Sequence, residues 1–409
     1  MSTKGFDTRN LHSDRSDKPE HGSLHKPIHT SIAFEYSDAR VLAEVFQGKR
    51  GGYNYGRQQN PTVAALQNRI TRMEDGLASV AFATGMAAIG SIFFSLLRAG
   101  DHVISSTFLF GNTNSLFNTF ARFGVDVTFV DATDVSAVAA ARRDNTRMVF
   151  LETIANPATQ VTDLEGIGKL CRQHNIVYIV DNTMTTPWLF QPKDVGASLI
   201  VNSLSKYIGG HGDALGGMVT ETGLFDWSTY PNLYDNYKVG PVSDWGLLQI
   251  KKKGLRDFGA TLGPEAAHHL AVGSETLSLR MDKAASNALA LARLLEQHPS
   301  ISRVCYPGLE SHPQHERASK LFRNFGALMS IELVDEVNCF DFLNRLQNVV
   351  LSSNLGDTRT LAIPVAHTIF FEMGAERRAS MGIGDSMIRL AVGIENTGDL
   401  LADFTQALA

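Results

Sequence analysis

Short apolar runs alternate with helical patterns between Pro61 and Asp257, and this alternation limits the folds open to the chain. Helical patterns such as Ala64–Met73 and Asp163–His174 separate several of the runs. Strands that are buried on both faces and joined by helices predict a doubly wound, mostly parallel α/β sheet, which binds ligands beyond the carboxyl ends of its strands. The predicted strands are Ser79–Ala83, His102–Ser106, Asp126–Val130, Met148–Glu152, Val177–Asp181 and Leu199–Asn202.

A second α/β region is predicted after the Gly- and Lys-containing stretch Lys251–Thr261. It begins with one long helical pattern, Glu265–His298. Strands are then predicted near Val304–Tyr306, Ala327–Leu333 and Met387–Val392, with a helix near Cys339–Leu346. This pattern indicates a smaller C-terminal domain, expected over residues 258–409, beside a central domain expected over residues 61–257.

Residues 1–60 lack sustained periodicity and end in a run rich in Gly, Tyr and Arg, from Gly51 to Arg57. Polar arms of this kind either take part in the assembly of subunits or have no role, and the composition of the run favours assembly. We therefore expect residues 1–60 to form an arm that contacts a neighbouring subunit.

Length and charge agree with a multidomain soluble protein. The chain has 409 residues, and hydrophobic cores stop growing at roughly 250–300 residues, so two domains or more are expected. Its 37 basic and 42 acidic residues leave a net charge of −5. This mild acidity argues against nucleic acid as a partner, because binding to phosphates needs a basic surface.

The cysteines indicate neither a disulfide framework nor a metal centre. Cys171, Cys305 and Cys339 are far apart and form no C-x-x-C pair, which fits a reducing, cytoplasmic location. The start, Met1 to Lys18, has no apolar core, so no secretory signal is expected. The most membrane-like stretch, Leu77–Leu97, is interrupted by polar residues and glycines and is predicted to be a buried strand running into a helix.

Lys206 is the first candidate for chemistry. It follows two serines and precedes the pair Gly209-Gly210. A lysine at the end of a buried strand is desolvated, which lowers its pKa and frees the amine for Schiff-base chemistry. A surface lysine beside a flexible loop is the alternative that this segment leaves open. A P-loop is not indicated, because the glycines of a P-loop precede its lysine, whereas here they follow it.

Two other segments lie where a doubly wound sheet binds ligands. Asp181 closes the apolar run Ile176–Val180, although it could instead cap the following turn. In Ala83-Thr84-Gly85-Met86 a strand meets a glycine and then good helix formers. Such a junction offers free backbone N–H groups to a phosphate, or is merely a connection.

The phosphate loop, the acid and the lysine, in this order, resemble the Cys/Met-metabolism enzymes that depend on pyridoxal 5′-phosphate (PLP). These include cystathionine γ-synthase and γ-lyase, methionine γ-lyase and the O-acylhomoserine sulfhydrylases. The resemblance extends from Tyr53 to Glu395. It implies PLP-dependent transferase fold type I, which is aspartate-aminotransferase-like, and homotetramers built from catalytic dimers.

The resemblance also implies a role for each residue that matches a family motif. Lys206 matches the Schiff-base lysine, and Asp181 matches the acid that holds the cofactor's ring nitrogen protonated. Asn156, which precedes Pro157, matches the residue near the cofactor's phenolic oxygen. The residues that match the phosphate site are Thr84, where the family usually has Ser, together with Gly85, Met86, Ser203 and Ser205.

Further matches lie at the two ends of the chain. Tyr55 and Arg57 match a pair that reaches the cofactor phosphate from the neighbouring subunit. Arg389 matches the arginine that grips the substrate carboxylate, a bidentate task that suits its planar fork. An edge-strand arginine facing solvent is the alternative for Arg389. Ser353 and Asn354 lie in a segment similar to the Asn-x-Gly-Asp motif of O-acetylhomoserine sulfhydrylases, so both are expected on the substrate side.

Phe110 departs from the family pattern. The family usually stacks a tyrosine on the cofactor ring in a Tyr-Gly-x-Thr motif, and this chain has Phe110-Gly111-Asn112-Thr113. A phenyl ring keeps the stacking and loses the phenol, so its proton transfers fall to Lys206, water or the substrate. The departure argues against a simple methionine γ-lyase, which would usually have Cys where Asn112 stands, whereas some sulfhydrylases are similar to this chain in having Phe.

The expected activity is γ-replacement or γ-elimination on a small amino acid, an O-substituted homoserine. The alternative is a γ-lyase for cystathionine, homocysteine, methionine or canavanine. A PLP carrier without turnover has no need of the carboxylate clamp expected at Arg389, and the phosphate loop disfavours a cofactor-free lysine aldolase. The sequence identifies neither the leaving group nor the nucleophile.

Overall fold

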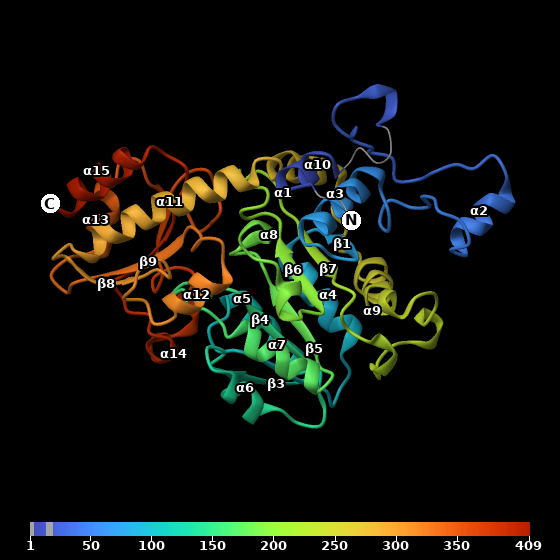
Figure 1. Cartoon of the computed structure of the whole chain (residues 1–409), viewed down its shortest axis with the longest axis horizontal. Coiled ribbons are helices and arrows are strands. Elements are labelled where there is room, and N and C mark those ends of the chain that lie inside the picture. The colour runs from blue at the N-terminus through green and yellow to red at the C-terminus, as the bar shows by residue number, and fades with distance from the viewer. Residues whose placement is uncertain (1–3, 14–18) are drawn as a thin grey trace.

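The computed structural model describes residues 4–13 and 19–409. Residues 1–3 and 14–18, which belong to the polar start Met1–Lys18, lie outside the described residues. Figure 1 shows two α/β bodies side by side, the larger formed by the central part of the chain and the smaller by its C-terminal part. A segment of the N-terminal region extends away from both bodies.

The large sheet has the strand order β1-β7-β6-β5-β4-β2-β3. Its strands are β1 Ala78–Phe82, β2 His102–Ser106, β3 Asp126–Val130, β4 Thr146–Glu152, β5 Val177–Asp181, β6 Leu199–Ser203 and β7 Gly217–Glu221. β7 runs antiparallel to both of its neighbours, and the other pairs are parallel. The sequence predicts every strand of this sheet except β7.

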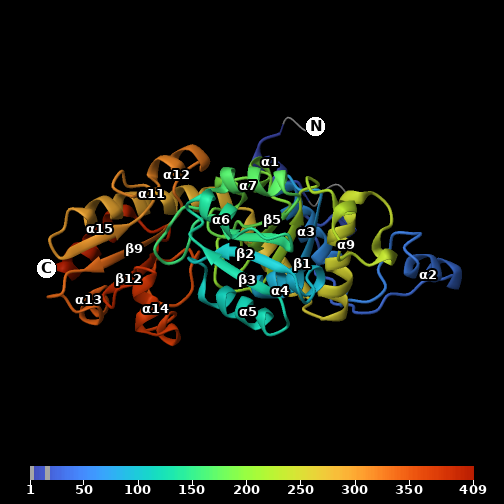
Figure 2. The same ribbon diagram turned by 90° about the horizontal axis from the view of Figure 1, so that it is seen from below.

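Both faces of the large sheet are buried, as its apolar strands predict. In β5, Val177 and Ile179 pack on one side, and Tyr178 and Val180 pack on the other. Figure 2 shows α6 and α7 on one side of the strands and α4 and α5 on the other. These helices are α4 Gly85–Leu96, α5 Gly111–Ala121, α6 Val135–Ala141 and α7 Leu164–Gln173. The doubly wound, mostly parallel sheet is therefore confirmed.

A separate sheet with the order β10-β11-β12-β9-β8 forms the core of the smaller body. Its strands are β8 Ile301–Cys305, β9 Leu328–Leu333, β10 Val350–Leu351, β11 Leu361–Pro364 and β12 Met387–Ala391. The helices beside it include α12 His315–Leu321, α13 Cys339–Arg345, α14 Ala375–Ser380 and α15 Thr397–Leu408. The smaller C-terminal α/β domain is confirmed, and the boundary at residue 258 stays a prediction.

The single helix predicted over Glu265–His298 is wrong. The structure has α10 Pro264–Ser274 and α11 Leu277–Glu296, and α11 extends from the large body to the small one (Figure 1). The end of α10 packs closely on the turn after Lys206, since a Cβ on Gly273 would lie 2.0 Å from the carbonyl oxygen of Gly209. Beyond the break, Arg280 donates to the carbonyl oxygens of Tyr207 and Ile208 at 2.6 and 3.0 Å. Both helices therefore brace the turn that follows Lys206.

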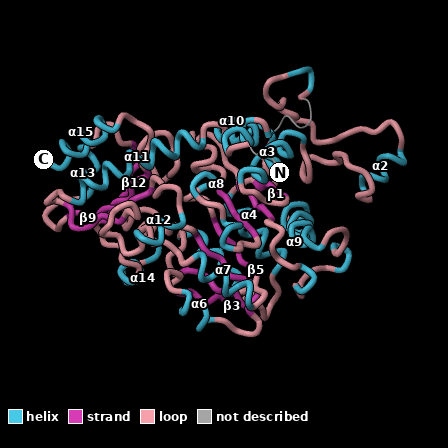
Figure 3. The backbone as a smooth tube through the Cα atoms, viewed as in Figure 1, coloured by secondary structure: helices cyan, strands magenta, loops and turns pink. Residues whose placement is uncertain are grey.

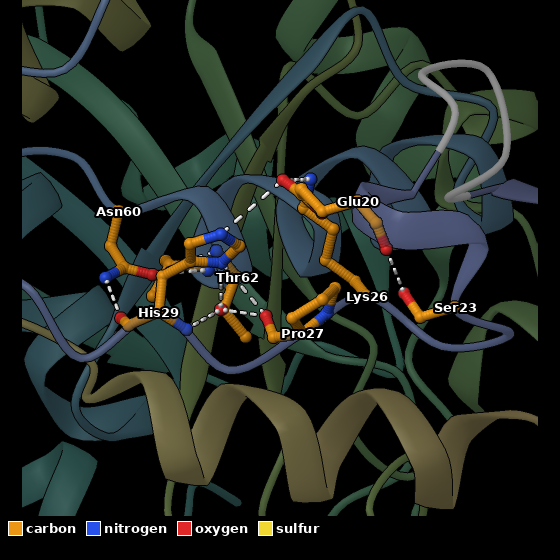
Figure 4. Close-up of polar contacts among 8 residues, drawn as sticks. Glu20, Ser23, Lys26, Pro27, His29, Asn60 and Thr62 are labelled. Atoms are coloured by element: carbon orange, nitrogen blue, oxygen red, sulfur yellow. Dashed lines mark hydrogen bonds and ion pairs between the residues drawn. The ribbon is translucent and has the colours of Figure 1, made fainter.

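Hydrogen bonds at the start of α3 Pro61–Met73 hold part of the N-terminal segment (Figure 4). Thr62 Oγ1 accepts from the His29 amide and donates to the Pro27 carbonyl, both at 2.9 Å, and Asn60 Nδ2 donates to the His29 carbonyl at 2.6 Å. Two short helices that the sequence does not indicate also lie in this segment: α1 Phe6–Leu11 and α2 Ala39–Phe46. Loops on either side of α2 carry it away from the large body (Figure 3).

The segment Leu77–Leu97 forms β1 and α4, as predicted. Across residues 4–13 and 19–409, no helix has both the length and the apolar character needed to cross a membrane. The three cysteines are buried free thiols.

Glu221, the last residue of β7, is a fully buried carboxyl group without a cationic partner among the described residues. Its oxygens accept from Trp227 Nε1 at 3.0 Å and from the Gly223 amide at 3.2 Å. Burial raises the pKa of Glu221 from 4.5 to about 8 against the opposing effect of these donors. Because its pKa is raised in the folded state, the protonated carboxyl group contributes its full stabilisation of the folded protein below pH 4.5. This stabilisation is lost as the pH rises through about 8.

We therefore expect the thermal midpoint of the cofactor-free protein to decrease as the pH rises from about 5 to about 8. Glu221→Gln should reduce this decrease, because glutamine does not titrate. The difference between the two proteins should reach about 2 °C or more. Thermal unfolding followed by circular dichroism across this range measures it. Parallel pH profiles of the wild type and the variant would contradict the expectation.

Candidate active site

Three neighbouring parallel strands of the large sheet end in polar residues at one edge. Glu152 ends β4, Asp181 ends β5 and Ser203 ends β6. Glu152 and Asp181 are paired in register, so their side chains leave the sheet on the same face. This is the edge at which doubly wound sheets bind ligands.

Lys206 lies in the turn that follows β6 and is partly buried. Its Nζ donates to Asn354 Oδ1 at 2.7 Å. Burial, assisted by the positive charge of Arg389, lowers the pKa of Lys206 from 10.5 to about 8. The amine therefore reaches its neutral, nucleophilic form close to physiological pH. Because Lys206 is partly buried and hydrogen-bonded, it is not a surface lysine beside a flexible loop.

Asn354 reaches Lys206 because the smaller domain packs tightly against the turn. A Cβ on Gly356 would lie 2.5 Å from the Tyr207 amide nitrogen, and Gly356 has a φ of +78°. Both the space and the backbone conformation favour glycine at this position. Ser353 is exposed beside it, and its carbonyl oxygen faces Arg389.

Arg389 lies in β12, which has a neighbour on each side, and its side chain is buried with a relative exposure of 2%. Nη2 donates to the carbonyl oxygens of Ser353 and Asn354, each at 2.9 Å, and Nη1 lies 3.5 Å from Oδ1 of the buried Asn156. Nε has no hydrogen-bond partner among the described residues. Arg389 is thus not a solvent-facing edge residue, and it is a buried cation that suits a carboxylate ligand.

Asp181 is held at the end of β5 by the backbone amide of Thr183, which donates to Oδ1 at 2.9 Å. Burial raises the pKa of Asp181 from 3.8 to about 6, and the bonds from Thr183 oppose this change. Thr183 also accepts, at Oγ1, from the Ser203 amide at 2.8 Å. Asp181 does cap a turn, as one of its two interpretations predicts, and its role toward a ligand stays a prediction. The sequence did not single out Thr183, which contacts both Asp181 and Ser203.

Glu152 is a second residue that the sequence did not single out. Its Oε1 accepts from the backbone amide of Phe110 at 3.0 Å, at the start of α5. Burial and the neighbouring charge of Asp181 raise the pKa of Glu152 from 4.5 to about 8. Glu152 ends an apolar strand just as Asp181 does, so the same positional signal would have found it. It fixes the backbone of Phe110 beside Asp181.

The start of α4 forms a cradle for an anion. Thr84 caps the helix and accepts from the Ala87 amide at 3.0 Å. The amides of Gly85 and Met86 have no hydrogen-bond partner among the described residues. A Cβ on Gly85 would lie 2.8 Å from the Ser203 Cβ, so only glycine lets the helix start approach β6 this closely. Free amides at the positive end of a helix bind phosphate.

Ser205 lies near this cradle, where its Oγ accepts from the Gly216 amide at 2.9 Å. Gly217, at the start of β7, also lies against the cradle. A Cβ on Gly217 would lie 2.1 Å from the Thr84 carbonyl oxygen, so this contact requires glycine. The predicted phosphate residues are therefore brought together from α4, β6 and the turn after β6.

Tyr55 and Arg57 do not join this cluster within one chain. Both are exposed, and the Arg57 guanidinium carbon lies 5.4 Å from the centre of the Tyr55 ring. The Arg57 side chain donates to the Arg256 carbonyl, and its own carbonyl accepts from Thr261 Oγ1 at 2.8 Å. In the part of the chain that the structure describes, neither residue contacts Lys206.

The assembled groups fit PLP. The cradle suits its phosphate, the amine of Lys206 suits its aldehyde, and the carboxyl group of Asp181 suits its ring nitrogen. The buried guanidinium of Arg389 has no anionic partner among the described residues, and its Nε is free, so it suits the carboxylate of an amino acid.

Comparisons with known proteins agree with this site. The family model described as Cys/Met metabolism PLP-dependent enzyme matches residues 7–409. An L-methionine gamma-lyase from Fusobacterium nucleatum subsp. polymorphum is 39% identical over 100% of this chain and 99% of its own. A homocysteine synthase from Schizosaccharomyces pombe is 34% identical over 100% of this chain and 99% of its own.

Among solved structures, a Campylobacter jejuni protein provisionally named O-acetylhomoserine (thiol)-lyase is 33% identical and superposes with a TM-score of 0.92. The match covers 99% of this chain and 100% of that protein, which carries N'-pyridoxyl-lysine-5'-monophosphate. The expected fold type I, the enzymatic nature of the chain and its PLP cofactor are thereby confirmed. The chain belongs to the family of Cys/Met metabolism PLP-dependent enzymes.

Proposed function

We propose that this enzyme replaces an oxygen-linked γ substituent of a homoserine derivative with a sulfur nucleophile, as an O-acylhomoserine sulfhydrylase or a cystathionine γ-synthase does. The observation that carries the proposal is Phe110, which brings no hydroxyl to the ring face where the family usually has a tyrosine. A homocysteine synthase among the relatives supports it. A homotetramer stays a prediction from the family resemblance, and a cytoplasmic location stays a prediction from the cysteine pattern.

Lys206 is proposed to anchor the cofactor and to move protons at the substrate's Cα and Cβ. Its lowered pKa lets it act as a base near neutral pH. Bound PLP supplies an electron sink conjugated with Cα. Asp181, ionised above about pH 6, keeps the ring nitrogen protonated, and this charge makes the sink effective.

The remaining groups are proposed to bind and orient. Arg389 binds the substrate carboxylate, with Ser353 and Asn354 beside it. Phe110 would stack on the cofactor ring, and Asn156 would face its phenolic oxygen. The phosphate is held by Ser203, Ser205, the Thr84 cap and the amides of Gly85 and Met86.

The leaving group follows from the proton donors that the site contains. An acyloxy group departs as a stable carboxylate, whereas a thiolate gains more from a proton donated as it leaves. Phe110 cannot donate a proton, and the side-chain partner of Lys206 is the amide of Asn354 rather than an acid. This arrangement favours an oxygen-linked substituent.

A second candidate is γ-elimination from methionine, which the 39% identical L-methionine gamma-lyase favours. Cystathionine, homocysteine and canavanine are further γ-lyase substrates to consider. A carrier without turnover and a cofactor-free aldolase are set aside, because the family consists of PLP-dependent enzymes.

A substrate panel tests the proposed function. It contains O-acetyl-, O-succinyl- and O-phosphohomoserine, cystathionine, methionine and canavanine, each with and without sulfide. We expect an O-acylhomoserine to have the highest kcat/KM and to yield a thiol product when sulfide is present. Release of 2-oxobutyrate from methionine at a higher kcat/KM would instead establish the second candidate.

Tyr55 and Arg57 are proposed to complete the phosphate site of a neighbouring subunit, since they are exposed and separate from their own chain's cluster. Arg57→Ala and Lys206→Ala chains should each be inactive, and mixing them should restore activity in hybrid dimers with one intact site. Native mass spectrometry first establishes subunit exchange. Hybrids that form and stay inactive would contradict the shared site.

Phe110→Tyr tests the argument about the leaving group. The added phenol should raise kcat/KM for cystathionine relative to an O-acylhomoserine, because a departing thiolate gains more from a donated proton. Both kinetic parameters are measured for both substrates in the wild type and the variant. Proportional changes for the two substrates would mean that Phe110 serves only as a stacking surface.

A further inference from the structure

Glu74 follows α3, and its carboxyl group is buried against the edge of the large sheet that carries the candidate active site. Its relative exposure is 0%. Asn202 Nδ2 donates to Oε1 at 2.6 Å, and Asn182 Nδ2 lies 3.1 and 3.3 Å from the two carboxyl oxygens. Two asparagines from adjacent strand ends therefore meet at one carboxyl group.

No cation balances this group. Among the described residues Glu74 forms no ion pair, and its side-chain partners are the two amides. Burial raises the pKa of Glu74 from 4.5 to about 7, and the bonds from Asn182 and Asn202 oppose this change. A buried carboxyl group held by neutral donors costs folding free energy, so its position calls for a role other than stability.

The two asparagines are direct neighbours of candidate site residues. Asn182 follows Asp181, and Asn202 precedes Ser203, at the end of the strand that leads to Lys206. Asn202 Oδ1 has no hydrogen-bond partner among the described residues, so Glu74 is the group that holds this side chain. Asn182 is also tied to the neighbouring strand, because its amide donates to the Val201 carbonyl at 2.8 Å.

A continuous set of contacts runs from Glu74 to the carboxylate of Asp181. Glu74 holds Asn202, and the next residue, Ser203, donates its amide to Thr183 Oγ1 at 2.8 Å. Thr183 in turn donates its own amide to Asp181 Oδ1 at 2.9 Å. A shift of the β6 end would therefore displace Asp181 together with the turn that carries Lys206.

We propose that Glu74 is a positioning residue for the reaction, which holds the ends of β5 and β6 in a fixed relation through Asn182 and Asn202. It thereby sets the spacing between Asp181 and Lys206. The proposal rests on the roles given to those two residues in the proposed function. It assigns Glu74 no contact with substrate or cofactor.

Glu221 provides a matched control. It is also fully buried, and its oxygens also accept from neutral donors. It lies at the opposite edge of the sheet, because it pairs with Leu199 at the start of β6 and with Ala78 at the start of β1. A general cost of altering a buried glutamate would appear in Glu74→Gln and Glu221→Gln alike.

The experiment compares these two variants. In Glu74→Gln an NH₂ group replaces one of the two acceptor oxygens, either Oε1, which accepts from both asparagines, or Oε2, which accepts from Asn182, so the strand ends lose part of their restraint. In the cofactor-free protein, we expect hydrogen exchange of residues 177–183 and 202–206 to be at least about threefold faster in Glu74→Gln and unchanged in Glu221→Gln. In the PLP-loaded enzyme, the pH midpoint of the cofactor's visible absorbance should shift in Glu74→Gln only, and kcat should fall about tenfold with little change in KM.

Equal changes in both variants, or none in Glu74→Gln, would overturn the proposal. Exchange and absorbance require no substrate, so they report on Glu74 even if the substrate panel refutes the proposed function. Should Glu74→Gln fail to fold, Asn202→Ser removes one of the two amides and serves in the same measurements. Unchanged exchange and absorbance in Asn202→Ser would overturn the proposal equally.

Discussion

The contact between residues 353–357 and the turn around Lys206 joins the two sheets into one site. Gly356 approaches the backbone of this turn closely enough for Asn354 Oδ1 to accept from Lys206 Nζ at 2.7 Å. The same segment turns carbonyl groups toward Arg389 in the smaller sheet. If the segment moved away, Lys206 would lose this partner and the buried guanidinium would lose two acceptors, each loss leaving a polar group unsatisfied. The lysine and the arginine are thus held at one site by a single piece of backbone.

Burial sets the protonation states of the site. It lowers the pKa of Lys206 to about 8 and raises that of Asp181 to about 6 and that of Glu152 to about 8. Lys206 is therefore half in its neutral form near pH 8, whereas at neutral pH Asp181 is ionised and Glu152 is mostly protonated. Two acids at adjacent strand ends thus take different charges, because ionising both would place like charges side by side without solvent. The charge on Asp181 is the one that a protonated ring nitrogen needs.

Much of the fold was predictable because both faces of the large sheet are buried. The strand Val177–Asp181 matches the structure residue for residue, since a run that is apolar on both faces stands out in the sequence. β7, Gly217–Glu221, was missed because it is antiparallel, begins with glycine and ends with a glutamate that only tertiary packing buries. The break between α10 and α11 was missed because the helical pattern continues across the residues that separate the two helices.

The sequence by itself determined the chemistry available to this protein, because Lys206, Asp181, Arg389 and the Gly85 junction lie in motifs that are read along the chain. Only the tertiary structure decided which groups cooperate. Glu74 looks like an ordinary solvated acid in the sequence, and Glu152 shows only that it ends an apolar strand. The importance of both comes from partners far along the chain, such as Asn202 for Glu74 and Phe110 for Glu152. The physical reason is that burial and hydrogen bonding depend on distances in space, which a linear pattern of residue types does not contain.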